Sequence, residues 1–198
     1  MNAYFDNHSA GLLLVLAIGG WAVIEASQAA AGRKAADQDT KGSRSLLWRY
    51  VNWTTLAVCS VMVHLAPHLV PAAAIRPGAS AFAAGLVIML AGMVLRGWSF
   101  LTLGKYFTFT VIVTPDQPVM TAGPYRVLRH PSYAGALLIC AGIGLASANL
   151  VGLAVLTVLP LALLLWRIHL EESALVATLG DAYRRYAAGH KRLVPLVW

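Results

Sequence analysis

Two polar clusters border one apolar hairpin in the second half of the chain. The first, residues 123–135, contains prolines, the Arg129–His130 pair and three residues that carry hydroxyl groups. The second ends the next apolar run, where Arg167 precedes Glu171 by four residues. That spacing places both side chains on one helical face, so a guanidinium suited to carboxylates would lie beside a hydrogen-bond-accepting carboxylate. Because ionisable groups at membrane depth are costly, the two clusters predict a functional site.

A helix start is expected inside the first cluster. His130 precedes a proline, which biases its backbone toward extended geometry. Pro131 suits the first position of a helix, where an N–H group would be unpaired in any case. The N–H groups around Ser132 and Tyr133 are then expected to be free, and such a helix start can bind a carboxylate. His130 could itself donate a hydrogen bond, although an isolated histidine is more often structural.

The composition indicates a membrane protein. Of the 198 residues, 59% are hydrophobic and the mean hydropathy is +0.68, whereas soluble domains are about 45–50% apolar. The length suggests one domain, residues 1–198, with three N-terminal helices in 1–101 and the catalytic part in 102–198. The net charge of +7 is concentrated in interhelical segments, which favours membrane orientation over nucleic-acid binding. No basic residue precedes the first apolar run, so no cleavable signal peptide is expected.

No metal or disulfide site is predicted. The two cysteines, Cys59 and Cys140, lie within apolar runs and have no metal-ligand spacing. His64 and His68 are one turn apart, but no third ligand accompanies them.

We therefore predict an all-α integral membrane protein with about five membrane-spanning helices, each judged against the roughly 20 residues that a crossing needs. They are residues 10–30, 51–70, 80–101, 133–148 and 150–170. The fourth is short and would tilt or thin the bilayer. Segments rich in lysine and arginine alternate with segments that have one or none. By the positive-inside rule the N-terminus lies outside, and both polar clusters face the cytoplasm from the cell (inner) membrane.

Two further segments are expected near the site. Residues 104–131 alternate aromatic and polar residues and then contain three prolines, so they should be irregular and line a cavity or lie at the surface. After residue 171 we expect an amphipathic cytosolic helix that Gly180 interrupts. Asp181 would cap a following short helix that carries Tyr183 and Tyr186 one turn apart.

Five ordered blocks resemble those of a known family. They are residues 123–125, 129–135, 171–175, 180–186 and 192–195. The pattern is similar to that of the isoprenylcysteine carboxyl methyltransferases and their wider relatives, which include phospholipid methyltransferases. The resemblance covers residues from about 96 to 198; the first half is similar only in being apolar helices. It implies methyl transfer from S-adenosylmethionine to a lipophilic acceptor from the bilayer. The favoured acceptor is the α-carboxylate of a prenylated cysteine, and a phospholipid amine or a small thiol is the alternative.

The resemblance also implies roles for individual residues. Arg167 would hold the acceptor carboxylate as the catalytic residue, and Arg192 would fold back to help bind the substrate. The residues expected to contact the cofactor are Gln117, Pro118, Val119, Met120, Tyr125, His130, Pro131, Ser132, Tyr133 and Glu171. Tyr125 and Tyr133 would stack on the adenine or face the sulfonium. Glu172 is a second choice, because it points elsewhere on the helix.

Simpler interpretations stay open for the same residues. Arg167 could be a snorkelling anchor, Glu171 a solvated charge at a helix end, and the tyrosines part of an interfacial belt. Arg96, near the cytoplasmic end of the third predicted span, fits an anchor or a site residue equally well.

Two other functions are also open for the whole chain. One is a membrane NADPH-dependent reductase, which cofactor preference would distinguish. The other is a non-catalytic transport component. The polar residues argue against it, because they gather at one face of the membrane and not along a path through its midplane.

Overall fold

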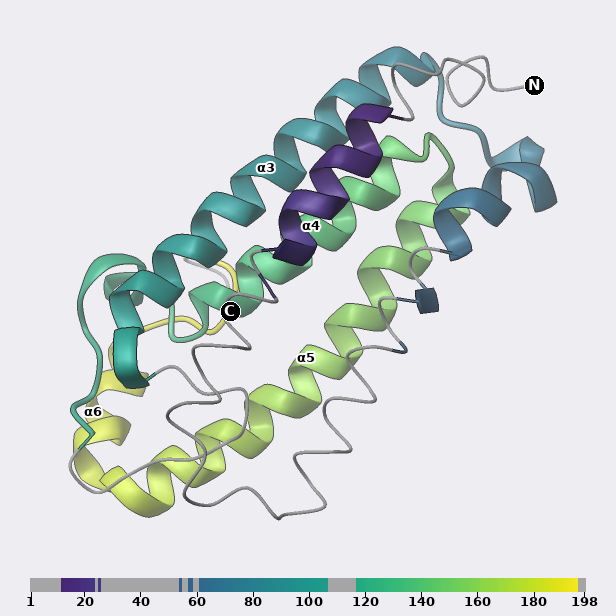
Figure 1. Cartoon of the computed structure of the whole chain (residues 1–198). Helices are drawn as coiled ribbons and strands as arrows, with labels where there is room; N and C mark the ends of the chain where they lie inside the picture. Colours follow the sequence, from purple (N-terminus) through teal and green to yellow (C-terminus); the bar gives the residue numbers. More distant parts are fainter. Residues whose placement is uncertain are drawn as a thin grey trace.

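The computed structural model describes residues 12–23, 25, 54, 57–58, 61–106 and 117–195, and every regular element among them is a helix. A helix over Leu12–Val23 and a helix over 61–69 precede the three long elements (Figure 1). The long elements are α3 (Gly78–Leu103), α4 (Pro131–Ala146) and α5 (Leu150–Leu179), and the short α6 (Asp181–Gly189) follows them. Three 3-10 turns complete the set: η1 (Pro71–Ala73), η2 (Gly104–Tyr106) and η3 (Gly123–Arg126). The all-α prediction is confirmed for this part of the chain.

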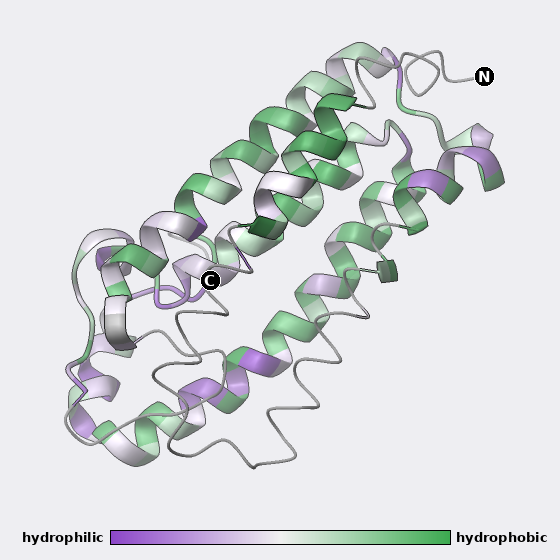
Figure 2. Ribbon diagram, viewed as in Figure 1, coloured by the Kyte–Doolittle hydropathy of each residue, from purple (hydrophilic) through white to green (hydrophobic). Residues whose placement is uncertain are grey.

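Two of these helices, α3 and α5, are long and apolar enough to cross a membrane, and Leu12–Val23 and α4 are shorter apolar helices. Large apolar side chains face outward; Val87, Val94 and Leu101 of α3 are all exposed, Val94 to 70%. Figure 2 shows hydrophobic residues along α3, α4 and most of α5, and hydrophilic residues toward the end of α5 that adjoins α6. An apolar outer surface of this kind fits a lipid environment. Much of the predicted spans 10–30 and 51–70 lies outside the described residues, so the number of crossings and the orientation stay predictions.

Paired glycines bring α3 and α4 into close contact. A Cβ added at Gly85 would lie 2.4 Å from the backbone nitrogen of Ala146, and one at Gly142 would lie 2.5 Å from that of Met89. About two turns further along α3, a Cβ at Gly92 would lie 2.6 Å from the carbonyl oxygen of Gly135. The helices are therefore antiparallel, and their backbones approach as closely as small residues at membrane helix interfaces allow.

Replacing Gly142 by alanine is expected to destabilise the protein by about 1–3 kcal/mol, because the added methyl group meets backbone atoms that cannot move aside. Gly97→Ala is the matched control, since Gly97 is likewise a glycine inside a long apolar helix, α3, and an added Cβ there has no atom within 4 Å. Thermal unfolding in detergent would compare the two variants. Equal unfolding temperatures would contradict the close approach of the two helices.

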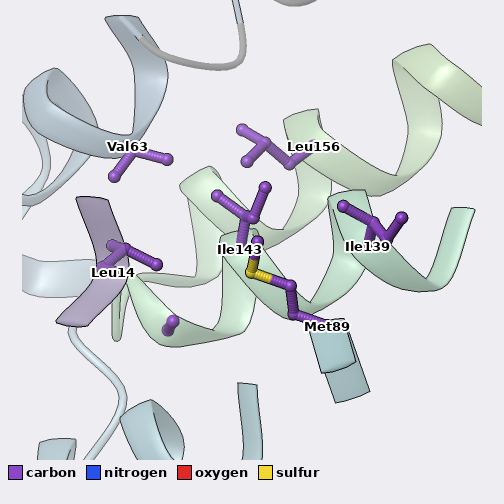
Figure 3. Packing of buried hydrophobic residues seen from close by; sticks show 7 residues of the cluster. Leu14, Val63, Met89, Ile139, Ile143 and Leu156 are labelled. Atoms are coloured by element: carbon purple, nitrogen blue, oxygen red, sulfur yellow. The ribbon is translucent and has the colours of Figure 1, made fainter. Parts of the chain in front are cut away.

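The core joins both halves of the chain. Leu14 and Val63, from the two helices before α3, pack against residues of α3, α4 and α5 (Figure 3). Those residues are Met89, Ile139, Ile143, Ala146 and Leu156. A smaller cluster lies at the polar end of the hairpin and consists of Leu128, Ala134, Ile168 and Leu193. The first-half helices therefore support the hairpin that carries the predicted site.

A tight turn at residues 147–149 joins α4 to α5. Ala148 adopts a left-handed φ of 51°. The Asn149 side chain caps α5 by accepting hydrogen bonds from the N–H groups of Val151 and Gly152 at 2.9 and 3.2 Å. Its amide nitrogen donates to the carbonyl of Val70 at 2.9 Å, which ties the hairpin to the end of the helix over 61–69.

Helix ends are partly as predicted. Pro131 is the first residue of the fourth apolar helix, as expected, but this helix ends at Ala146 and not at 148. The helix expected after residue 171 is present as the continuation of α5, which passes the predicted end of the fifth span at 170 and ends at Leu179, where Gly180 takes a φ of 55°. The expected Asp181 cap is also incorrect: Gly180 occupies the N-cap position, and Asp181 pairs with Arg184 in the first turn of α6.

Candidate active site

The two polar clusters predicted from the sequence meet at one end of the hairpin. Tyr133, in the first turn of α4, donates its hydroxyl hydrogen to Glu171 Oε2 on α5 at 2.6 Å. The Nε atom of Arg167, one turn earlier on α5, lies 3.4 Å from the same hydroxyl oxygen. Arg167 is only 6% exposed. A guanidinium and a carboxylate are thus held together at the boundary between the apolar and polar parts of α5.

The second carboxylate on α5 binds cations of the protein itself. Glu172 Oε1 lies 2.8 Å from Nη1 of Arg129 and 3.1 Å from Nε2 of buried His130. Its other oxygen, Oε2, accepts a hydrogen bond from Nη2 of Arg192 at 2.9 Å. As expected, Glu172 points to partners other than those of Glu171, and here these partners come from two distant segments.

The C-terminal tail folds back onto the segment before α4, as predicted for Arg192. The backbone N–H groups of Arg129 and His130 donate to the carbonyls of Lys191 and Arg192 at 2.7 and 3.1 Å. These contacts accompany a parallel bridge between Leu128 and Lys191. The tail therefore forms one wall of the site.

The short helix α6 is also hydrogen-bonded to the segment before α4. Tyr186 donates from its hydroxyl to the carbonyls of Tyr125 and Leu128 at 2.7 and 3.3 Å. Burial raises the pKa of Tyr186 to about 12, so the hydroxyl stays protonated and remains a donor. Tyr183 is also buried, which places both tyrosines on the inner face of α6.

The start of α4 differs from the prediction in one respect. His130 is the N-cap residue, and its ring stacks on that of Tyr133 with centroids 5.5 Å apart. The N–H groups of Tyr133 and Ala134 both donate to the His130 carbonyl at 3.1 Å. The expectation that the Tyr133 N–H is free to bind a carboxylate is therefore wrong. Ser132 is buried, and its carbonyl and hydroxyl oxygens both accept hydrogen bonds from Arg96.

Two buried polar atoms in this part of the described structure have no hydrogen-bond partner, Nε of Arg129 and the hydroxyl of Tyr183. Burial raises the pKa of Tyr183, so both atoms offer hydrogen atoms at neutral pH. Buried donors without partners are costly. Such donors suit a bound ligand or water that supplies acceptor oxygens.

The segment before η3 contains the four residues 117–120 that the family resemblance assigns to the cofactor. Gln117, Val119 and Met120 are half-buried and Pro118 is exposed, in the non-helical stretch that leads to η3. Gly123 begins η3 with a φ of 55°, and a Cβ there would lie 2.7 Å from Oγ1 of Thr102 in α3. That close approach explains the glycine of the Gly-Pro-Tyr block.

Tyr125, also in η3, is buried close to the Tyr133–Glu171 pair. Burial is the main cause that raises the pKa of Tyr125, and the negative charge of Glu171 is the second.

Residues 107–116 of the predicted irregular segment lie outside the described structure.

Comparison with known proteins gives the chain a family likeness. The sequence model of the isoprenylcysteine carboxyl methyltransferase (ICMT) family matches residues 84–177, just under half of the chain. The likeness to the isoprenylcysteine carboxyl methyltransferase family is confirmed. The matched range begins before the first block identified in the sequence and contains Arg167, Glu171 and Glu172. It ends before the blocks at 180–186 and 192–195.

Curated relatives carry the same family name. Protein-S-isoprenylcysteine O-methyltransferase A of Arabidopsis thaliana is 30% identical over 115 residues, which are 57% of this chain and 58% of that protein. Protein-S-isoprenylcysteine O-methyltransferase of Schizosaccharomyces pombe is 31% identical over 113 residues, 54% of this chain and 46% of that one. The chain thus matches less than two thirds of the length of these relatives.

A solved structure extends the likeness to the first half of the chain. The eukaryotic intramembrane Ras methyltransferase ICMT superposes with a TM-score of 0.64 and 22% identity, covering 93% of this chain and 68% of that one. At this identity the match establishes a shared fold. The shared fold covers more of the chain than the sequence resemblance, which begins at about residue 96.

Proposed function

We propose that the protein is an integral membrane methyltransferase that transfers the methyl group of S-adenosylmethionine to the α-carboxylate of a prenylated cysteine. The observation that carries the proposal is the Tyr133–Glu171 hydrogen bond beside buried Arg167 at the end of an apolar hairpin. All three residues lie inside the range that matches the isoprenylcysteine carboxyl methyltransferase family. The names of the curated relatives support the same acceptor.

The donors and acceptors present fit such a cofactor. Glu171 offers a carboxylate to the cationic part of the cofactor, and Tyr133 fixes one of its oxygens. The partnerless Arg129 Nε and Tyr183 hydroxyl offer hydrogen atoms to oxygen atoms of a ligand. Residues 117–120, Tyr125 and the start of α4 would line the adenosine and methionyl parts.

Arg167 would bind the acceptor carboxylate beside the methyl donor. When bound, the cofactor supplies a methyl group already activated by a positively charged sulfur. Transfer of that methyl group to a carboxylate would form a C–O bond as the C–S bond breaks, and it would require no proton transfer from the protein. The protein therefore needs to orient the two reactants, and proximity of this kind is worth about 7–11 kcal/mol. The planar fork of Arg167 suits that task.

The proposed topology has five membrane crossings, an outer N-terminus and an active site facing the cytoplasm of the cell (inner) membrane. The cofactor would enter from the cytoplasm into the pocket formed by residues 104–131, the hairpin and the tail. The lipophilic acceptor would enter sideways from the lipid bilayer. The apolar outer surface of α3 and the positive-inside pattern support this arrangement.

Wild-type protein in detergent is expected to bind S-adenosylmethionine in calorimetry, and Glu171→Gln should weaken that binding at least tenfold. Loss of one charge-assisted hydrogen bond costs about 1.5–3 kcal/mol, and each 1.4 kcal/mol corresponds to a factor of about ten. Asp181→Asn is the matched control, because it removes a carboxylate whose side chain is 75% exposed. N-acetyl-farnesylcysteine, a phospholipid amine and a small thiol would then be compared as acceptors.

Folded wild-type protein that binds no S-adenosylmethionine would overturn the proposal. Binding of NADPH in its place would point to the reductase, and the absence of any nucleoside ligand to a transport component.

A further inference from the structure

An ion pair joins the first helical segment to α3 inside the apolar bundle. Nε and Nη2 of Arg96 bind the two carboxylate oxygens of Glu25, the second at 3.0 Å. The side chains of Arg96 and Glu25 are only 11% and 16% exposed. Trp21 donates from its indole nitrogen to Glu25 Oε1 at 3.1 Å. Because desolvation opposes much of the attraction, a buried pair is weak evidence for stability, and its presence at membrane depth points to function.

The remaining terminal nitrogen of Arg96 reaches the start of α4. Nη1 donates to both the carbonyl oxygen and the hydroxyl oxygen of Ser132, each at 2.9 Å. The guanidinium carbon also lies 4.6 Å from the centroid of the Phe100 ring, a cation–π contact that further fixes its plane. Arginine has a rigid fork of donors, so it can bind the Glu25 carboxylate and both oxygens of Ser132 at the same time. Lysine has a single charged nitrogen and cannot.

Ser132 lies between residues of the proposed cofactor site. Tyr133 follows it and donates to Glu171, while His130 caps the same turn and stacks on Tyr133. A shift of Ser132 would displace Tyr133, and small displacements of site groups are costly in methyl transfer, which depends on orientation. Supporting residues of this kind hold a site in its productive geometry.

We propose that Glu25 and Arg96 are positioning residues that fix the first turn of α4, and with it Tyr133, in the arrangement that binds S-adenosylmethionine. This assigns a role to the first helical segment, which supplies Glu25. Because the role rests on the proposed function, its test includes a measurement made without any ligand.

Three variants in detergent distinguish two roles of Arg96: positioning the first turn of α4, and joining the first helical segment to α3 through the ion pair. Arg96→Lys keeps the charge but removes the fork, and Glu25→Gln weakens the support of Arg96. The double swap Glu25→Arg with Arg96→Glu restores an ion pair between the helices but leaves Ser132 without its donor. Arg184→Lys is the control, because Arg184 also pairs with a carboxylate at 2.9 Å but its side chain is 64% exposed.

Hydrogen exchange at the amides of Tyr133 and Ala134 is expected to be at least tenfold faster in Arg96→Lys than in the wild type, and unchanged in Arg184→Lys. The dissociation constant for S-adenosylmethionine should rise at least tenfold in Arg96→Lys and by a smaller factor in Glu25→Gln. The swap should recover much of the lost thermal stability but not the affinity.

Wild-type exchange and affinity in Arg96→Lys would overturn the role of Arg96, and so would a swap that recovers both stability and affinity. If the swap does not fold, the result with Arg96→Lys decides. Failure of the wild type to bind S-adenosylmethionine would refute the proposed function and this role in cofactor binding together. Exchange in the ligand-free protein would then still show whether Arg96 fixes the first turn of α4.

Discussion

Arg167→Lys is expected to lower kcat/KM for N-acetyl-farnesylcysteine about 100-fold while leaving the dissociation constant for S-adenosylmethionine within about threefold of the wild type. Lysine keeps the positive charge but cannot hold a carboxylate with two parallel hydrogen bonds. Loss of one such charged interaction costs about 1.5–3 kcal/mol, and each 1.36 kcal/mol is a factor of about ten in rate. Initial rates over a range of acceptor concentrations, beside calorimetry with the cofactor, would test this.

The same variant distinguishes the two interpretations of Arg167. A snorkelling anchor needs only a long side chain with a charged end, so lysine at this position should then leave kcat/KM unchanged. A change confined to cofactor affinity would instead place Arg167 at the cofactor. Arg126→Lys is a suitable control, because Arg126 is an exposed arginine on η3 at the same end of the hairpin.

The helical hairpin could be predicted from the sequence because its signals are local. Pro131 marks the start of α4, and Asn149 caps α5 through its own side chain. The predicted end of the fifth span at residue 170 falls inside α5, because that boundary was placed by hydropathy. The residues after Arg167 become polar, but they include good helix formers such as glutamate, alanine and leucine. A change in polarity therefore alters what surrounds a helix without ending it, and α5 ends at Gly180, where the backbone turns left-handed.

The pairing of Arg167 with Glu171 was likewise local, since both lie one turn apart on one helix. Their contact with Tyr133 could be predicted only as a meeting of two clusters, because it depends on how α4 and α5 pack. The expectation of a free Tyr133 N–H at the start of α4 failed for a local reason. The His130 carbonyl accepts from the Tyr133 N–H, a contact that sequence does not reveal.

The contacts that sequence reasoning missed join residues far apart in the chain. Arg96 and Glu25 are 71 positions apart, and nothing near Arg96 in the sequence indicates a partner in the first helical segment. The paired glycines of α3 and α4 are separated in the same way. Their seven-residue spacing, Gly85 to Gly92 and Gly135 to Gly142, is a signal that could have been noticed. A glycine repeat in each of two apolar runs is typical of close helix packing in membranes.

Glu172→Gln is expected to destabilise the protein by about 2–3 kcal/mol and to release the C-terminal tail. The Glu172 side chain is 13% exposed and neutralises cations from the segment before α4 and from the tail. Removing its charge leaves Arg129 and Arg192 facing each other without compensation. Breaking a fully buried pair costs about 3–5 kcal/mol, and the cost expected here is at or below the lower end of that range because Arg192 is 35% exposed and partly screened by solvent. Thermal unfolding and limited proteolysis of the tail would measure both effects.

The comparison with Glu171→Gln makes this prediction specific, because the two glutamates are neighbours on one helix but bind different partners. Glu172→Gln should lower stability first and affinity for S-adenosylmethionine as a consequence, since the tail and η3 would form part of the proposed cofactor pocket. Glu171→Gln should lower affinity with little loss of stability, because Tyr133 is its hydrogen-bond donor and remains beside it. If the two variants unfold at the same temperature, Glu172 does not hold the tail. If they also lose the same affinity, both carboxylates contact the cofactor directly.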